Sequence, residues 1–369
     1  MRMIRMSVSR TRSHDLRRIV ALGAALVLAA GMSACSALKS ESSSSASAPH
    51  TIAPGKTLTV STSFYPIQYL AEAIGGPLVK VSTVTPSNVE PHDFELSGKE
   101  TAELGKADLI AYVPGFQPSL DKAVKEVGSG PTVVDLSKPA NLVHHEGVEE
   151  EHEHSEEASA SATDAASAVA TAQSSEAGHD DHGHAEHSQA EGGEDHDGDL
   201  DPHFWLDPTR MASAATQIGD ALAQADPTNA ETYKKNAASM KSQMEALSKK
   251  LVDGTAKCQH KEFVTSHEAF GYLADRTGLT QLGLSGLDPD STPSPARLKQ
   301  ISDAVKAKGI TTIFTEELLS PKVAETLAKD LGITTAVLDP IESQADDSKD
   351  YEAVMNENLE ALQKALSCE

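Results

Sequence analysis

The chain has 369 residues and a formal net charge of −24, because 55 acidic residues outnumber 31 basic ones. Eighteen of the acidic residues, and no Lys or Arg, lie between His144 and Asp201. Because no basic stripe is available to neutralise phosphates, nucleic acid is excluded as a partner, and the length suits two domains of ordinary size.

The first 34 residues have the pattern of a secretory signal. Arginines precede an apolar run at 19–30, which is too short to span a bilayer comfortably and is followed by small residues. We expect residues 1–34 to be removed and Cys35 to carry a lipid that anchors the protein outside the cytoplasm. Cleavage near Ala34 without a lipid is the alternative. The Ser/Ala-rich stretch 35–56 is predicted to be a flexible tether.

Short strand-like and helix-like segments alternate from residue 58 to residue 136. The pattern predicts strands at 58–62, 79–84, 109–113 and 132–134, and helices at 67–74, 99–106 and 120–127. Such alternation indicates a parallel sheet with helices on both faces. We expect residues 57–143, together with 201–225, to form a first α/β lobe.

Residues 144–200 differ in kind, since they lack hydrophobic periodicity and are rich in Ser, Ala, Glu, Asp, His and Gly. Such a composition cannot bury enough apolar surface to offset chain entropy, which predicts a disordered loop. Clustered histidines beside carboxylates form weak, exchangeable Zn²⁺ sites, so we expect this loop to collect zinc; a solvated spacer is the alternative. Its nine histidines are His144, His145, His152, His154, His179, His182, His184, His187 and His196.

Two helix starts follow, each an Asp-Pro pair, at Asp207-Pro208 and at Asp226-Pro227. After the second pair, apolar residues recur at helical spacing as far as Leu251. We therefore predict a linking helix at 226–252, about 38 Å long at ~1.5 Å per residue. A helix of this length between two α/β regions is suited to act as a rigid strut joining two lobes.

A second α/β lobe is predicted at 253–369. Its expected strands lie at 262–265, 280–284, 311–314 and 335–338, and its helices at 268–276, 294–308, 321–331 and 351–366. Beyond Cys35 the chain has two cysteines, Cys258 and Cys368. In an oxidising compartment an even count predicts one disulfide, whereas two buried thiols are the alternative.

Three histidines occupy similar places in the predicted elements. His92 follows a strand, His203 precedes a capped helix, and His267 directly follows another strand. In open α/β sheets, ligand sites gather outside the carboxyl ends of the strands. We expect the three imidazoles to meet in the cleft between the lobes, where they would suit Zn²⁺.

Asp339, directly after the strand at 335–338, is the expected fourth ligand. Glu90, Glu268 and water are the alternatives. The remaining histidines outside the signal and the loop, His50 and His260, are expected to be surface residues.

These motifs resemble those of the metal-binding substrate-binding proteins of ABC importers, the ZnuA/TroA-like family of zinc and manganese receptors. The resemblance covers about 58–366. It rests on Ser63-Phe64-Tyr65-Pro66, Glu90-Pro91-His92-Asp93-Phe94-Glu95, His203-Phe204-Trp205-Leu206-Asp207-Pro208, Ser266-His267-Glu268-Ala269-Phe270-Gly271-Tyr272-Leu273 and Leu338-Asp339-Pro340.

The resemblance implies that His92, His203, His267 and Asp339 are the metal ligands. We further expect a monomeric receptor that hands Zn²⁺ to an ABC permease without a chemical step. Manganese members of the family tend to place a carboxylate where this chain has His267, which favours zinc. The alternatives are a secreted zinc hydrolase with Glu268 as base, a surface adhesin stabilised by zinc, and a manganese or nickel receptor.

Overall fold

The computed structural model describes residues 51, 55–145 and 200–369, all of which belong to one compact unit, Ser47–Glu369. The predicted signal, the lipidation site Cys35 and most of the predicted loop lie outside the described residues. Within the described ranges, no helix combines the length and the apolar character needed to cross a membrane.

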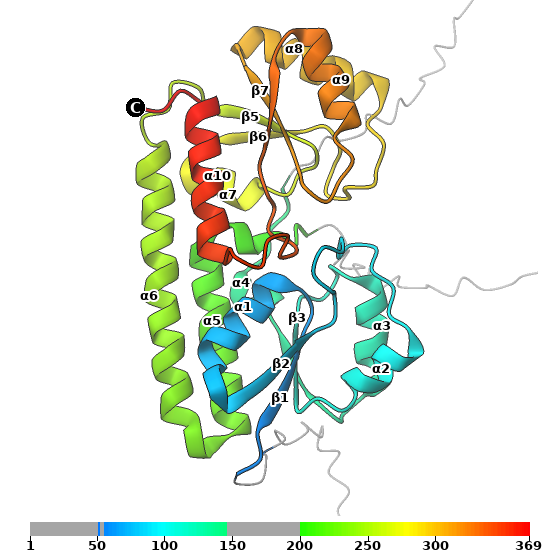
Figure 1. Cartoon of the computed structure of the whole chain (residues 1–369), viewed down its shortest axis with the longest axis vertical. Helices are drawn as coiled ribbons and strands as arrows, with labels where there is room; N and C mark the ends of the chain where they lie inside the picture. Colours follow the sequence, from blue (N-terminus) through cyan, green and yellow to red (C-terminus); the bar gives the residue numbers. More distant parts are fainter. Residues whose placement is uncertain (1–50, 52–54, 146–199) are drawn as a thin grey trace, which may run out of the picture. The chain divides into compact units, whose positions relative to one another are not determined.

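The first lobe contains a four-stranded parallel sheet with the order β2-β1-β3-β4 (Figure 1). Its elements are β1 (Leu58–Thr62), α1 (Tyr65–Gly75), β2 (Val79–Thr83), α2 (Gly98–Leu104), β3 (Leu109–Tyr112), α3 (Pro118–Val127), β4 (Thr132–Asp135) and α4 (Ser137–Ala140). The carboxyl ends of these parallel strands therefore share one edge of the sheet.

The second lobe contains another four-stranded parallel sheet, with the order β6-β5-β7-β8. Its elements are β5 (Glu262–Thr265), α7 (Gly271–Thr277), β6 (Thr280–Gly283), α8 (Pro295–Lys308), β7 (Thr312–Thr315), α9 (Lys322–Leu331), β8 (Thr334–Val337) and α10 (Tyr351–Ala365). The prediction of two α/β lobes, each with a parallel sheet, is confirmed.

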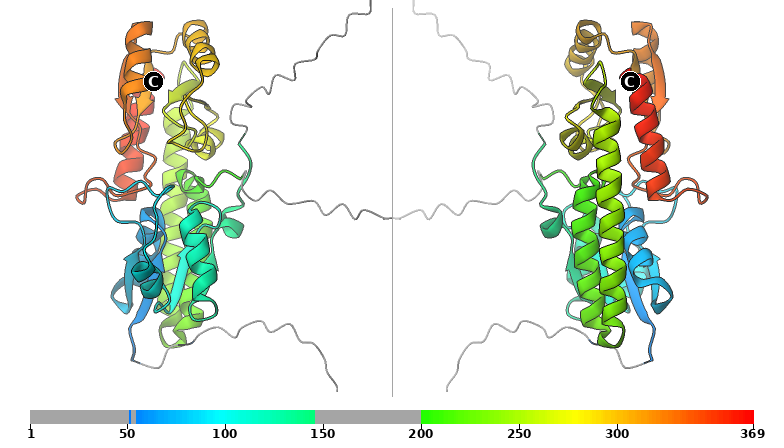
Figure 2. Two further views of the ribbon diagram at one scale, coloured as in Figure 1. Left: turned by 90° about the vertical axis from the view of Figure 1, so that its right-hand side faces the viewer. Right: turned by 90° about the vertical axis from the view of Figure 1, so that its left-hand side faces the viewer.

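Two long helices connect the sheets. Asp207 caps α5 (Pro208–Ala225) by accepting a hydrogen bond from the backbone N–H of Thr209, and Pro208 occupies the first turn. The 26-residue α6 (Ala230–Thr255) packs on α1 and α5 of the first lobe and on α7 and α10 of the second (Figure 2). The expected long helix therefore spans both lobes.

The largest hydrophobic core is shared by the two lobes. It includes Leu58 in β1, Leu222 in α5, Leu251 in α6, Phe263 in β5 and Leu362 in α10. Smaller clusters cover the other face of each sheet, under α2 and α3 in the first lobe and under α8 and α9 in the second. The apolar packing is therefore continuous across the two lobes.

The predicted disulfide is present, joining Cys258, shortly after α6, to Cys368, shortly after α10. The strands and helices of the second lobe all lie between its two cysteines. The disulfide thus closes this lobe into a covalent loop.

Candidate metal centre

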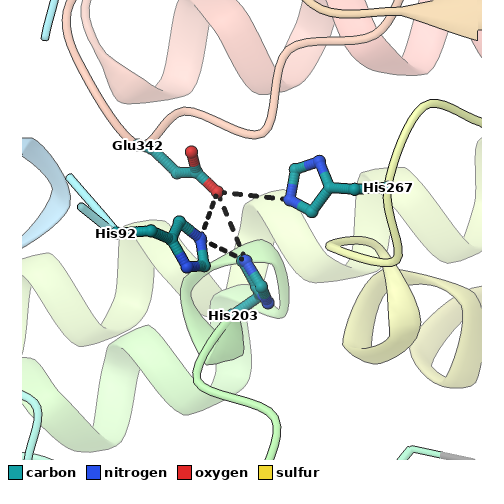
Figure 3. Close-up of side chains that lie close together, drawn as sticks. All are labelled: His92, His203, His267 and Glu342. Atoms are coloured by element: carbon teal, nitrogen blue, oxygen red, sulfur yellow. Dashed lines mark hydrogen bonds and ion pairs between the residues drawn. The ribbon is translucent and has the colours of Figure 1, made fainter. Parts of the chain in front are cut away.

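Four side chains from distant parts of the chain meet between the lobes: His92, His203, His267 and Glu342 (Figure 3). One potential ligand atom from each lies within 4.8 Å of the others. The Glu342 Oε1 atom is 3.4, 3.3 and 3.5 Å from the Nε2 atoms of His92, His203 and His267, respectively. Three imidazole nitrogens and one carboxylate oxygen thus converge on a common centre.

The fold brings these residues together because each lies after a strand or before a helix at the place where the two lobes meet. His92 lies in the connection between β2 and α2, and His203 immediately precedes the short 3-10 turn that leads into α5. His267 and Glu342 lie in the segments after β5 and β8. Each lobe contributes two of the four side chains, so the cluster forms only when both lobes are in place.

Two of the histidines have a carboxylate partner that fixes the ring. The Nδ1 atom of His203 lies 2.7 Å from Oδ1 of Asp201, and the Nδ1 atom of His267 lies 2.8 Å from Oε1 of Glu316. Each contact leaves Nε2 facing Glu342. Metal-binding histidines in proteins are commonly oriented by such carboxylates.

His92 is held mainly through its backbone. Its N–H donates to Oε1 of Glu90 over 3.0 Å, and the preceding carbonyl of Pro91 accepts from Nε2 of Gln117 over 3.1 Å. Its ring packs edge-on against Phe116. Glu90, one of the alternatives for the fourth ligand, therefore supports the loop of His92 and is not in the cluster.

Charge within the cluster is strongly coupled. Burial alone would raise the pKa of Glu342, but the imidazoles of His203, His267 and His92 hold it well below its usual range. Burial would lower the pKa of His267, but Glu316 and Glu342 outweigh it and raise that pKa to about 10. Burial would also lower the pKa of His203, but Asp201 and Glu342 outweigh this effect and raise that pKa.

Two of these buried atoms have no hydrogen-bond partner, Nε2 of His267 and Oε1 of Glu342. Buried polar atoms are normally paired, and an unpaired one needs an explanation. A cation at the common centre would satisfy both, with the histidines binding as neutral imidazoles after losing their protons. The donor set therefore fits a nitrogen-preferring divalent metal.

Asp339, the expected fourth ligand, is not in this group. Its Oδ1 atom accepts a hydrogen bond from the backbone N–H of Ile341 over 2.7 Å, and Glu342 takes the fourth place instead. Glu268 is also outside the group and pairs with Arg297 over 3.1 Å. Glu342 was not among the ligands expected from the sequence, because it lies beyond the strand end at which Asp339 was expected to bind.

Of the nine histidines assigned to the loop, only His144 and His145 are described. His145 lies between the lobes, with Nδ1 2.5 Å from Oδ2 of Asp201 and Nε2 3.0 Å from Oδ2 of Asp275 in α7. Because Asp201 also holds His203, a continuous chain of contacts runs from Asp275 in the second lobe to the cluster.

Comparisons with known proteins point to one family. The family model described as zinc-uptake complex component A, periplasmic, matches residues 60–365. The zinc-binding lipoprotein AdcA of Streptococcus pneumoniae is 33% identical over 329 residues, which cover 86% of this chain and 57% of that protein. The high-affinity zinc uptake system protein ZnuA of Bacillus subtilis is 33% identical over 318 residues, covering 85% of this chain and 88% of that protein.

Solved structures agree. The AdcAII protein of Streptococcus pneumoniae matches with a TM-score of 0.65 and 32% identity, covering 85% of this chain and all of that one. The laminin-binding protein Lmb of Streptococcus agalactiae, described as a bifunctional protein with adhesin and metal-transporting activity, matches with a TM-score of 0.66 and 30% identity, covering 84% of this chain and all of that one. The chain spans little more than half the length of the AdcA relatives it matches.

Proposed function

Because the chain belongs to the ZnuA family of zinc-uptake components, we propose that it is an extracytoplasmic receptor that captures Zn²⁺ with high affinity and delivers it to an ABC-type importer. The observation that carries this proposal is the buried meeting of three imidazoles and one carboxylate between the lobes. Two relatives, AdcA and ZnuA, are described as a zinc-binding lipoprotein and a zinc uptake system protein, respectively.

His92, His203, His267 and Glu342 are the proposed ligands. A set of three nitrogens and one oxygen suits the tetrahedral preference of Zn²⁺, whereas manganese favours sites richer in oxygen. The contacts of Asp201 and Glu316 with Nδ1 atoms support this assignment, because they direct Nε2 of His203 and His267 towards the ion.

A receptor is favoured over a zinc hydrolase by the same geometry. Catalytic zinc sites keep one coordination position open for water or substrate, whereas here four protein ligands converge. Glu268, the proposed base of the hydrolase alternative, is paired with Arg297.

Two further parts of the proposal concern residues outside the described ranges. Cys35 is proposed to carry the lipid anchor, in line with the lipoprotein description of AdcA. The His-rich segment is proposed to collect zinc for the cleft, because its histidines are interleaved with carboxylates. Deleting residues 146–199, while keeping His145, should slow zinc capture from a competing chelator; an unchanged rate would remove this role.

The central test is zinc titration by calorimetry with a chelator competitor. Wild-type protein should bind one Zn²⁺ tightly in the cleft, and His92→Ala should weaken that binding sharply while His260→Ala, a histidine remote from the cluster, should not. Zinc uptake by cells carrying each variant should follow the same order. A His92→Ala variant that titrates like wild type would refute the site, and tighter binding of Mn²⁺ than Zn²⁺ would assign a different metal.

A further inference from the structure

The segment that carries Glu342 has an unusual backbone. Ile341, the residue just before it, has φ = +59°, in the left-handed region that β-branched residues rarely adopt. Its side chain is 1% exposed, so it is locked in the shared core. Strained residues of this kind persist only where the surroundings enforce them, and they cluster at functional sites.

Hydrogen bonds within the second lobe enforce this conformation. Oδ1 of Asp339 accepts from the backbone N–H of Ile341 over 2.7 Å, which closes a short turn of the kind that Asp and Asn side chains form. Asn358 in α10 fixes Asp339 in turn. Its Oδ1 accepts from the Asp339 N–H over 2.9 Å, and its Nδ2 donates to the Asp339 carbonyl over 2.7 Å.

The first lobe holds the same segment from the other side. Nε1 of Trp205 donates to the carbonyl of Pro340 over 2.7 Å, and the backbone N–H of Asn88 donates to Oγ of Ser343 over 2.7 Å. The residues on both sides of Ile341 and Glu342 are therefore tied to fixed points. The backbone that carries Glu342 is thus held by contacts from both lobes.

We propose that Asp339 is a positioning residue, which holds Ile341 in its left-handed conformation and thereby directs the Glu342 carboxylate at the three imidazoles. This inference rests on the proposed function, because it concerns the same metal centre. It gives Asp339 a different role from that of ligand: the side chain supplies a hydrogen-bond acceptor to the backbone.

The turn requires an acceptor atom and not a negative charge. Burial, together with Glu317, Glu342 and Glu316, raises the pKa of Asp339 to about 6, so the surroundings disfavour its charged form. An asparagine at this position offers an equivalent Oδ1 to Ile341 and has no charge to bury. Alanine offers no acceptor. These two substitutions therefore separate positioning from coordination.

The experiment compares zinc affinity in Asp339→Ala, Asp339→Asn and Glu342→Gln, measured by chelator competition. Asp339→Ala should weaken binding by about 10- to 100-fold, the usual effect of removing a residue that orients a ligand. Asp339→Asn should remain close to wild type, and Glu342→Gln should be the weakest of the three. Asp346→Ala is the matched control, because Asp346 closes a similar turn with Ser348 at an exposed position.

Visible absorption of Co²⁺ bound to the same variants reports the donor set directly. The spectrum of Asp339→Asn should match that of wild type, because its ligands are unchanged. An affinity for Asp339→Asn as low as that for Asp339→Ala, or an altered Co²⁺ spectrum, would overturn the proposal, and so would an unaffected Asp339→Ala. Failure of wild-type protein to bind Zn²⁺ would instead refute the proposed function.

Should Asp339→Ala not fold, Asn358→Ala tests the same turn from the α10 side. It removes both bonds to the Asp339 backbone and leaves every proposed ligand in place. Asn358→Ala should also weaken zinc binding. Thermal melting of the metal-free variant, monitored by circular dichroism, checks that it folds. Unchanged affinity in a folded Asn358→Ala variant would also overturn the proposal.

Discussion

The two lobes contain sheets of the same strand order, yet they are closed in different ways. The first is built from two separated stretches of chain, because α5, which comes after residue 200, packs against α1, α4 and β4. The second is continuous and is closed by the disulfide between Cys258 and Cys368. Two similar sheets can thus be stabilised either by packing from a later segment or by a covalent link.

Although the two lobes are closed in different ways, they contribute equally to the candidate metal centre. Each lobe supplies two of the four side chains, and each supplies one histidine whose Nδ1 atom contacts a carboxylate, Asp201 in the first lobe and Glu316 in the second. If the site depends on both lobes equally, matched changes on the two sides should have matched effects. The following predictions test that symmetry.

Removing the disulfide should have the largest effect of the changes considered, because the disulfide closes only the second lobe. Replacing Cys258 and Cys368 with Ser should lower the free energy of unfolding by about 2–5 kcal/mol, since the unfolded chain gains freedom over a separation of 110 residues. Urea denaturation measures the loss, and hydrogen exchange should show it in β5–β8 before β1–β4. A reductant should destabilise wild type and leave the double variant unchanged; equal exchange in both lobes would contradict the prediction.

Removing one ligand from each lobe tests the symmetry of the site itself. His203→Ala and His267→Ala should each weaken zinc binding by more than about 100-fold, because a lost ligand costs more than a lost orienting partner. Both side chains are fully buried, so metal-free melting must be recorded beside the calorimetric titration. A large effect in only one of the two variants would show that one lobe dominates binding.

The orienting carboxylates should give smaller, matched effects. Asp201→Asn and Glu316→Gln should each reduce zinc affinity by about 10- to 100-fold, since a neutral amide oxygen holds the Nδ1–H of His203 or His267 more weakly than a carboxylate does. Chelator competition measures both. Asp201 also contacts His145, so Asp201→Asn should additionally lower the melting temperature of the metal-free protein more than Glu316→Gln does.

Lowering the pH by one unit should have the smallest effect on zinc affinity of the changes considered. The pKa values of His203 and His267 are both raised, the latter to about 10, so in the absence of metal the imidazole of His267 holds its proton at neutral pH. Zinc must displace this proton, so affinity should fall as pH is lowered, by about tenfold per pH unit. Calorimetry in buffers of different ionisation enthalpy counts the protons; a pH-independent affinity between pH 6 and 8 would contradict the expectation.

Much of the fold could be predicted because it rests on local patterns. Alternating strands and helices indicated the parallel sheets, and the Asp207-Pro208 pair indicated the start of α5. The positions of His92, His203 and His267 beside element ends indicated that they could meet, and the structure places them together.

Local sequence patterns could not predict that Glu342 joins the cluster, because its position depends on tertiary contacts. It lies three positions after the strand-end aspartate, and the turn between them is enforced by Trp205 and Asn358, which come from other elements. His145 is a similar case. Composition assigns it to a polar loop, but hydrogen bonds to Asp201 and Asp275, 56 and 130 residues further along the chain, fix it between the lobes.

The same hydrogen bonds hold residues 143–145 close to residue 201. The backbone N–H of Asp201 donates to the carbonyl of Val143 over 3.0 Å, so the chain departs and returns at almost the same point. Both ends of the intervening sequence are therefore fixed at one point beside the proposed zinc centre, by contacts with Asp201 and Asp275.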